Sequence, residues 1–278
     1  MKRKFFVFVA AILISHAFIT GLNCNVYADT KDEKVVVFVY HHLLEDSEDK
    51  SRNNPAAVSV ESFEEQMKYL YDNDYTTITL QALNDHLKYG KPLPSKNVLI
   101  TFDDGYQSNY IYAYPILKKY GFKASIFMIT SCISYKTQAF DPERLSFMSK
   151  EEIDESKDVF EFACHTHNLH RLQDNGKSTL LNSDKKTIVK DLSKSKRLIH
   201  TKFFAYPHGQ YNKEIESILK EKGFELAFTV NFGEVDKRSN RFELNRVTIF
   251  YTTSIDEFKG ILDRYRNDRG HEPVKKSL

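Results

Sequence analysis

The sequence contains no tryptophan, only three cysteines and, beyond its first 20 residues, no long hydrophobic run. So few cysteines exclude a disulfide framework, and the fold must therefore depend on an ordinary hydrophobic core. No later segment has the roughly 20 apolar residues that a membrane-spanning helix needs. A basic excess is also missing, since 40 Lys and Arg face 38 Asp and Glu, which argues against a nucleic-acid-binding protein.

The N-terminus has the pattern of a secretory signal peptide. Three basic residues follow Met1, residues 5–20 are apolar but short for a membrane span, and the triplet 26–28 has small residues where a signal peptidase reads. We therefore expect cleavage after residue 28, with a retained membrane anchor as the less favoured alternative. Removing the segment takes away three basic residues, and the mature chain would carry 37 basic against 38 acidic residues.

The rest of the chain has the composition of one globular domain, expected over residues 29–266. The charged stretch Glu45–Asn54 predicts a mobile loop, and the polar residues 267–278 predict a disordered tail. Two cysteines remain in the mature chain, Cys132 and Cys164. Sequence leaves open whether they form a disulfide or stay as free thiols.

Apolar, β-branched runs alternate with amphipathic segments along the domain. Strands are expected at 35–39, 76–80, 98–102, 123–130, 159–163, 203–205, 226–230 and 247–250. Helices are expected from Ser62, whose capping-box partner would be Glu65, then at 81–89, up to Tyr120, at 187–200, at 212–222 and after Ser254. This alternation predicts an α/β fold with a parallel sheet and outer helices. Seven or eight such units favour a closed β/α barrel over an open sheet.

The clearest chemical signal is the carboxylate pair Asp103-Asp104, which directly follows an expected strand and precedes Gly105. Two adjacent carboxylates cannot both enter a core without a large desolvation cost. Successive side chains diverge at a strand end, so the two carboxylates can have different roles in one site. The alternative is an Asp-Gly surface turn.

A second signal is the string His165-Thr166-His167-Asn168-Leu169-His170, again directly after an expected strand. Histidine is a common transition-metal ligand, and imidazole together with carboxylate suits zinc. Two weaker clusters also follow strands. They are Tyr40-His41-His42 and the turn 205–209, each of which could equally be structural.

Together, the four clusters resemble the polysaccharide deacetylases of carbohydrate esterase family 4, whose first motif nearly matches Thr-Phe-Asp-Asp-Gly at 101–105. The closer similarity is to the circularly permuted branch, of the intercellular adhesion protein B type, that deacetylates poly-β-1,6-N-acetylglucosamine. Tyr40-His41, the string 165–170 and the turn 205–209 carry this closer match, which extends over essentially all of the mature chain. The resemblance implies a distorted, circularly permuted barrel of seven or eight β/α units.

The resemblance implies a role for each matching residue. Asp103 is the implied general base, and Asp104, His165 and His170 are the implied ligands of a divalent metal, Zn²⁺ with Co²⁺ or Ni²⁺ as alternatives. The family's second histidine usually stands four residues after the first, where this chain has Leu169, and in this branch it stands five residues on. His167 is the alternative ligand.

Residues Val39-Tyr40-His41 resemble the family's terminal Leu-x-His motif, which implies His41 as the general acid, ahead of His42 and His208. The turn at Tyr206, Pro207 and His208 would contact the substrate and supply a backbone N–H for the oxyanion.

Two departures from the family pattern concern the walls of the site. The third motif of the family contains an arginine that orients the base, but no arginine precedes Pro207, and Arg246 is our predicted substitute. The fourth motif uses a tryptophan, which this chain lacks.

The implied protein is a secreted or cell-surface, metal-dependent hydrolase that removes N-acetyl groups from extracellular poly-β-1,6-N-acetylglucosamine, a biofilm adhesin. Neither a nucleic-acid partner nor a transmembrane segment in the mature form is expected. The alternatives are a peptidoglycan or chitin N-deacetylase and a non-catalytic glycan-binding protein on the same scaffold. A two-metal phosphoesterase would need more carboxylate ligands than this single pair.

Overall fold

The computed structural model describes residues 34–48 and 55–267. All of these residues belong to one structural unit, which begins at Lys31. The predicted signal peptide, the charged loop beyond residue 48 and the tail beyond Asn267 lie outside the described residues. Within the described part, no helix combines the length and the apolar character needed to cross a membrane.

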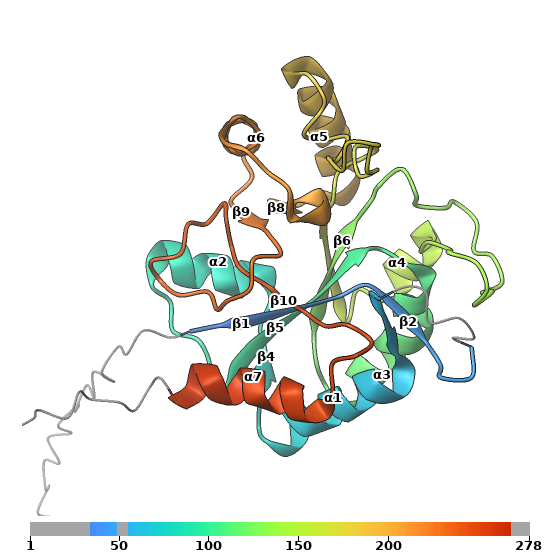
Figure 1. Ribbon diagram of the computed structural model, residues 1–278, viewed down its shortest axis with the longest axis vertical. Helices are drawn as coiled ribbons and strands as arrows, with labels where there is room; N and C mark the ends of the chain where they lie inside the picture. Colours follow the sequence, from blue (N-terminus) through green and yellow to red (C-terminus); the bar gives the residue numbers. More distant parts are fainter. Residues whose placement is uncertain (1–33, 49–54, 268–278) are drawn as a thin grey trace, which may run out of the picture. The chain divides into compact units, whose positions relative to one another are not determined.

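A curled sheet of eight strands, parallel at every strand-to-strand pairing, forms the centre of the fold (Figure 1). The strands are β1 (Val36–Tyr40), β4 (Thr76–Thr77), β5 (Asn97–Asp104), β6 (Ala124–Met128), β7 (Phe160–Cys164), β8 (Phe203–Ala205), β9 (Leu226–Phe228) and β10 (Val247–Thr248). Their order is β10-β1-β5-β6-β7-β8-β9, and β4 pairs with β5. The predicted α/β class and distorted barrel are confirmed.

No regular strand ladder joins β9 to β10, the two ends of this order, among the described residues. A short segment, residues 244–248, spans the gap, and we call it the seam. Leu244 forms a single parallel bridge with Phe228 of β9, and the N–H of Arg246 donates to the carbonyl of Asn231 at 3.0 Å. Further along the seam, Val247 pairs with Phe38 of β1. The barrel therefore closes through a few hydrogen bonds.

Seven α-helices surround the sheet. They are α1 (Val60–Asp72), α2 (Leu80–Tyr89), α3 (Tyr114–Lys119), α4 (Lys150–Glu155), α5 (Lys185–Ile199), α6 (Lys213–Glu221) and α7 (Ile255–Asn267). A π-helical turn, η1 (Asn109–Ala113), leads into α3, and a 3₁₀ turn, η2 (Pro207–Gly209), follows β8. In Figure 1, α1 and α7 lie on one side of the sheet, whereas α5 and α6 lie near β8 and β9.

The strands are apolar throughout because both of their faces are buried. Alternate residues of β1 show this. Val37 belongs to an inner cluster that also contains Leu99 and Phe127, whereas Phe38 faces the helices and stacks on Phe258 of α7, with ring centroids 4.7 Å apart. Side chains alternate across a strand, so neighbouring residues enter different cores.

Some element boundaries differ from the sequence prediction. The predicted capping box at Ser62 and Glu65 is wrong, because the helix begins three residues earlier. Ser59 has extended backbone angles, and its hydroxyl accepts the N–H of Ser62. The predicted strand 76–80 ends at Thr77, since Thr79 is the N-cap of α2. Side-chain acceptors at these positions satisfy N–H groups that the first helical turn leaves free.

Sequence patterns did not predict α4 or the small parallel pair β2 (His42–Leu44) and β3 (Ala57–Ser59). A capping box of Ser149 and Glu152 starts α4, although the helix is only six residues long.

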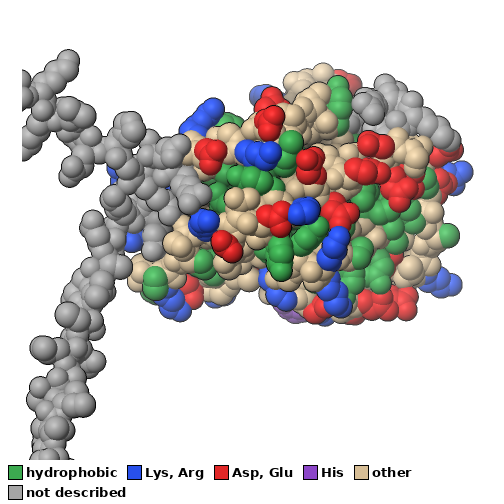
Figure 2. Space-filling model, turned by 90° about the horizontal axis from the view of Figure 1, so that it is seen from below, with side chains coloured by type: hydrophobic (Ala, Val, Ile, Leu, Met, Phe, Trp, Pro, Cys, Tyr) green, Lys and Arg blue, Asp and Glu red, His purple; other side chains and the backbone are tan. Residues whose placement is uncertain are grey.

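Figure 2 shows the side on which α1 and α7 lie, where acidic and basic side chains are interspersed. This mixture of charges indicates a solvated face. An ion pair on such a face contributes about 0–1 kcal/mol to stability.

Candidate active site

Polar side chains gather at the carboxyl ends of the barrel strands, where parallel barrels hold their active sites. Asp104 ends β5, His165 follows β7, His41 follows β1 and the η2 turn follows β8. Three non-glycine residues with left-handed backbone lie here: Asp104 (φ 70°), Thr166 (φ 71°) and His208 (φ 54°). Such conformations cost energy and are typical of functional sites.

Asp103 points into the barrel, on the same face of β5 as Thr101. Arg246 meets it there with two parallel hydrogen bonds, Nη1 to Oδ1 and Nη2 to Oδ2, each 2.7 Å long. The Nε of Arg246 also donates to the carbonyl of Thr229 at 2.8 Å, and the arginine is fully buried. The predicted neighbour of Asp103 is therefore in contact with it, and both carboxylate oxygens are fixed.

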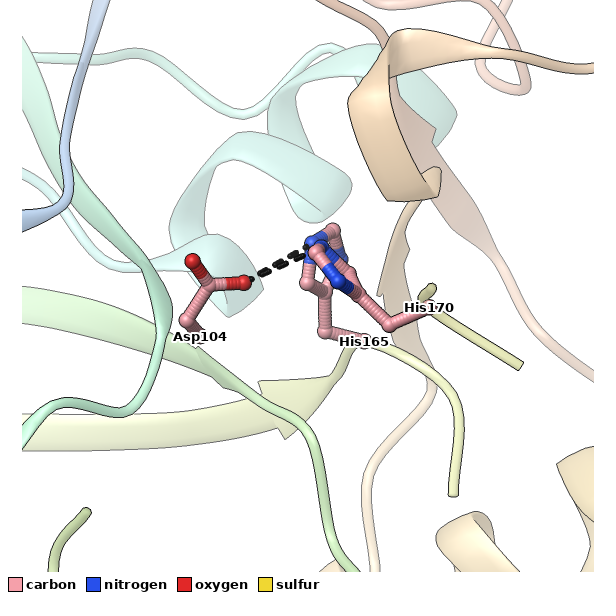
Figure 3. Close-up of side chains that lie close together, drawn as sticks. All are labelled: Asp104, His165 and His170. Atoms are coloured by element: carbon pink, nitrogen blue, oxygen red, sulfur yellow. Dashed lines mark ion pairs between the residues drawn. The ribbon is translucent and has the colours of Figure 1, made fainter. Parts of the chain in front are cut away.

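Asp104 turns away from this pair because its positive φ redirects the side chain. Figure 3 shows its carboxylate directed at the rings of His165 and His170. Oδ1 of Asp104 lies 3.6 Å from Nε2 of His165 and 3.1 Å from Nε2 of His170. The three candidate ligand atoms all lie within 4.8 Å of one another. The structure thus brings together the three residues that the sequence analysis grouped as metal ligands.

The carboxylates are ionised despite their burial. Burial raises the pKa of Asp103, but the charge of Arg246, together with its hydrogen bonds, outweighs burial, and the net direction is down. Burial likewise opposes ionisation of Asp104, but contact with His170 contributes most to holding its pKa well below the usual range. Nearby positive groups stabilise the charged form of a carboxyl group.

His165 is held in one orientation and one protonation state. Its Nδ1 lies 2.8 Å from the carbonyl oxygen of Ala205, which can only accept, so Nδ1 carries the proton. Nε2 then presents a lone pair to the cluster. Burial is the main reason that the pKa of His165 falls to about 4, so the ring is neutral at physiological pH. A neutral imidazole fixed through its other nitrogen is the usual form of a metal-bound histidine.

The three candidates for the general acid differ in their surroundings. His41 is half-buried, and its Nδ1 is buried without a hydrogen-bond partner among the described residues. Its charge is among the smaller causes of the lowered pKa of Asp103 and Asp104, which places it near both. By contrast, His42 lies 2.8 Å from the hydroxyl of Ser108, and Nε2 of His208 lies 2.8 Å from the carbonyl of His170.

Within the turn predicted to supply an oxyanion N–H, the N–H of Tyr206 itself is already used. Its N–H donates to the carbonyl of Phe228 at 3.0 Å as part of the sheet, and its buried hydroxyl donates to the carbonyl of Phe242. Pro207 has no N–H. Of the three residues named for this task, only His208 has a backbone N–H that could serve.

His167, the alternative metal ligand, lies outside the cluster. Its Nδ1 is 3.0 Å from the hydroxyl of Thr130, and the ring borders a groove of about 710 Å³ that Phe162 and Leu198 also line. His170 lies in the cluster instead, because the five-residue spacing brings its ring to 4.8 Å from that of His165, centroid to centroid.

Comparison with known proteins identifies the family of this chain. Residues 90–227 match the polysaccharide deacetylase family. The chain is also 34% identical over 224 residues to the poly-β-1,6-N-acetyl-D-glucosamine N-deacetylase of Staphylococcus aureus, a match that covers 78% of this chain and 73% of the relative. The chain belongs to the polysaccharide deacetylase family. It is therefore a polysaccharide N-deacetylase, as predicted, and the alternative of a non-catalytic glycan-binding protein is not supported.

Solved structures of polysaccharide deacetylases have the same fold. The structure of IcaB from Ammonifex degensii has a TM-score of 0.69 and 27% identity, with 83% of this chain and 96% of that chain covered. Streptococcus pyogenes deacetylase PplD in complex with acetate has a TM-score of 0.72 at 24% identity, over 84% of this chain and 99% of that chain. At that level of identity the likeness supports the fold alone.

Two residues beside Asp104 were missed by the sequence analysis of this deacetylase. Burial and the Asp104 carboxylate raise the pKa of Tyr106, whose ring stacks on Phe147 at 5.2 Å. Burial, with a smaller effect of Asp104, also raises the pKa of Cys132. Tyr106 could have been found from its place directly after Asp-Asp-Gly, whereas nothing in the sequence around Cys132 relates it to Asp104. The sequence left open whether Cys132 and Cys164 form a disulfide. In the structure both are free thiols.

Proposed function

We propose that this polysaccharide N-deacetylase is an exported, metal-dependent enzyme that acts on poly-β-1,6-N-acetylglucosamine. The substrate is carried over from the Staphylococcus aureus relative, whose printed name specifies that glycan. Export rests on the sequence pattern of residues 1–28, which lie outside the described part. N-terminal sequencing of the protein recovered from culture medium tests export, with Asp29 as the expected first residue.

The single observation that carries metal dependence is the state of Asp104 Oδ1. This buried oxygen is within 3.6 Å of two imidazole nitrogens, yet it makes no hydrogen bond of good geometry with any described group. A buried acceptor without a partner is costly. One carboxylate and two neutral imidazoles are a donor set that zinc prefers, with positions left for water and substrate. Asp104, His165 and His170 would therefore hold the ion.

A bound divalent ion would polarise the acetyl carbonyl and lower the pKa of a bound water toward neutrality. The protein's own contribution begins with Asp103, which accepts a proton as the oxygen of water attacks the acetyl carbon. Arg246 keeps Asp103 in place, because its two hydrogen bonds fix the carboxylate plane while each oxygen retains a second lone pair.

The leaving group requires a proton, since an amine is expelled poorly as an anion. His41 would donate it, because the residue interacts electrostatically with both carboxylates and its buried Nδ1 has no hydrogen-bond partner among the described residues. The C–N bond then breaks, and acetate and a glucosamine unit are the products. The N–H of His208 would donate to the oxyanion in the transition state, and one such donor is typically worth about 3 kcal/mol.

The test is acetate release from three oligomers: poly-β-1,6-N-acetylglucosamine, chitin and peptidoglycan fragments. Wild-type protein and Asp104→Ala are each assayed after chelation and again with added Zn²⁺, Co²⁺ or Ni²⁺. We expect metal-dependent release that is fastest from the β-1,6 polymer and absent in the variant. Faster release from chitin or peptidoglycan would overturn the substrate, and release that survives chelation would overturn metal dependence.

A further inference from the structure

The six residues His165–His170, here called the histidine loop, carry two of the three candidate metal ligands. The loop has no regular structure of its own, and Thr166 is in the left-handed region. Inside the loop, the N–H of Leu169 donates to the hydroxyl of Thr166 at 3.3 Å, and contacts with neighbouring elements also position His170 relative to His165.

One carboxylate from another element meets the middle of this loop. Asp191, in α5, accepts the N–H of His167 at Oδ1 and the N–H of Asn168 at Oδ2, and both distances are 2.7 Å. Asp191 is only 8% exposed, and no ion pair involving it occurs within residues 34–48 and 55–267. Its buried charge is therefore compensated chiefly by the two loop N–H groups.

The opposite side of the loop is held by the end of β6. The N–H groups of Thr130 and Ser131 donate to the carbonyls of Thr166 and His167, at 3.1 and 3.0 Å. The loop thus lies between β6 on one side and α5 on the other. Two further contacts hold the end of the loop near His170: the N–H of Leu180 donates to the carbonyl of Leu169 at 3.0 Å, and Nε2 of His208 lies 2.8 Å from the carbonyl of His170. Asp191 holds the middle of the loop, at the N–H groups of His167 and Asn168.

We infer that Asp191 is a positioning residue for the candidate metal site, an inference that rests on the proposed function. It contacts neither substrate nor metal. It holds the backbone between His165 and His170, so that both Nε2 atoms face Asp104. An amide could not replace it, because Asp offers two acceptors to two N–H groups, whereas Asn would turn its NH₂ group toward one of them.

The test compares Asp191→Asn with wild type in two measurements. Calorimetric titration of the chelated protein with Zn²⁺ or Co²⁺ alone should show affinity about 10- to 100-fold weaker in the variant, the usual effect of losing a group that orients ligands. Amide hydrogen exchange of the metal-free protein should be faster at His167 and Asn168. Asp191→Glu, which keeps the carboxylate, should give a metal affinity and an exchange rate between those of wild type and Asp191→Asn.

The matched control is Asp184→Ala on the same helix. Asp184 caps α5 by accepting the N–H of Thr187 at 2.9 Å, and it does not touch the histidine loop. This change should loosen α5 without altering metal affinity or exchange in the loop. Equal weakening by Asp184→Ala would mean that Asp191 acts only through helix stability, and would overturn the inference.

The two measurements also separate this inference from the proposed function. If wild type binds metal and Asp191→Asn binds it equally well with unchanged exchange, the positioning role is overturned. If wild type takes up no metal, the metal-dependent mechanism fails, and the exchange data decide whether Asp191 holds the loop. Should Asp191→Asn fail to fold, Asp191→Glu provides the same two comparisons.

Discussion

Asp103 and Asp104 are neighbours in the chain and both are buried, yet their oxygens meet different partners. Each carboxylate oxygen of Asp103 accepts one hydrogen bond from the guanidinium of Arg246. Asp104 faces two imidazole nitrogens, and its Oδ1 is left without a hydrogen bond among the described residues.

The protein itself neutralises Asp103 through Arg246, whereas Asp104 is the carboxylate that we propose as a metal ligand. Alternation along β5 places Asp103 on the inner face, beside a buried arginine. The left-handed backbone at Asp104 then turns the next side chain toward the mouth of the barrel. One strand end thereby supplies two chemically different groups, and the predictions below test that division.

The largest expected effect is a split between the two isosteric changes, Asp104→Asn and Asp103→Asn. Asp104→Asn should abolish tight Zn²⁺ binding and lower acetate release roughly 10⁴-fold, because a metal contributes several kcal/mol to such reactions. Asp103→Asn should retain metal binding and lose activity. Calorimetry and an acetate assay measure both properties. Equal loss of metal binding in the two variants would contradict the division of roles.

A second change removes the partner of Asp103. Arg246→Met leaves a buried, uncompensated carboxylate and should lower the free energy of unfolding by about 3–5 kcal/mol. Urea denaturation of the metal-free protein measures this. The double variant Asp103→Leu with Arg246→Met should recover much of the loss, since no buried charge remains. A double variant as unstable as the single one would argue that Arg246 stabilises the seam by packing alone.

A third prediction concerns pH and the imidazole that faces Asp104. The pKa of His165 is lowered from 6.5 to about 4, chiefly by burial, so between these values the unfolded chain binds a proton that the folded chain does not. This contribution to stability is present in full above pH 6.5 and is lost as the pH falls toward 4. Unfolding of the chelated protein should lose roughly 2–3 kcal/mol over that window from this residue.

His165→Asn should remove that part of the pH dependence. The control is His200→Asn, at an exposed left-handed C-cap position of α5 where asparagine is well tolerated. The control should retain the wild-type slope. A wild-type slope that His165→Asn leaves unchanged would show that other groups cause the acid sensitivity.

The smallest effect is expected outside the ligand cluster, at the capping box that starts α4. Ser149→Ala removes the side-chain acceptor of the capping box that starts α4 and should cost about 1 kcal/mol of stability. Metal affinity and acetate release per folded molecule should not change. A change in metal affinity would mean that the site depends on this part of the fold, and that the comparison of Asp103 with Asp104 is too local.

The sequence predicted the sheet well because each strand is an apolar run buried on both faces. It also placed Asp103, Asp104, His165 and His170 correctly at strand ends, since parallel strands bring their carboxyl ends to one edge. Arg246 was predicted only as a substitute for the arginine of the family's third motif, which is missing before Pro207. Arg246 and Asp103 are 143 positions apart in the chain, and no local sequence pattern predicts their contact.

Other features could not be predicted because they depend on tertiary hydrogen bonds. The N–H of Tyr206 is used by the neighbouring strand, which no pattern within 205–209 indicates. The sequence analysis placed the cap of α1 at Ser62, and only the extended backbone at Ser59 shows that the cap lies three residues earlier. Asp191 reads as an ordinary polar residue of α5 until the fold brings the histidine loop against it.

One residue of the seam contributes both to the closure of the barrel and to the candidate active site. Arg246 lies within the seam, and the same residue that bonds to Asn231 through its backbone holds Asp103 through its side chain. A shift of the seam relative to β5 would therefore also move the guanidinium that fixes the carboxylate of Asp103. The closure of the barrel and the orientation of Asp103, which we propose as the general base, depend on the same residue.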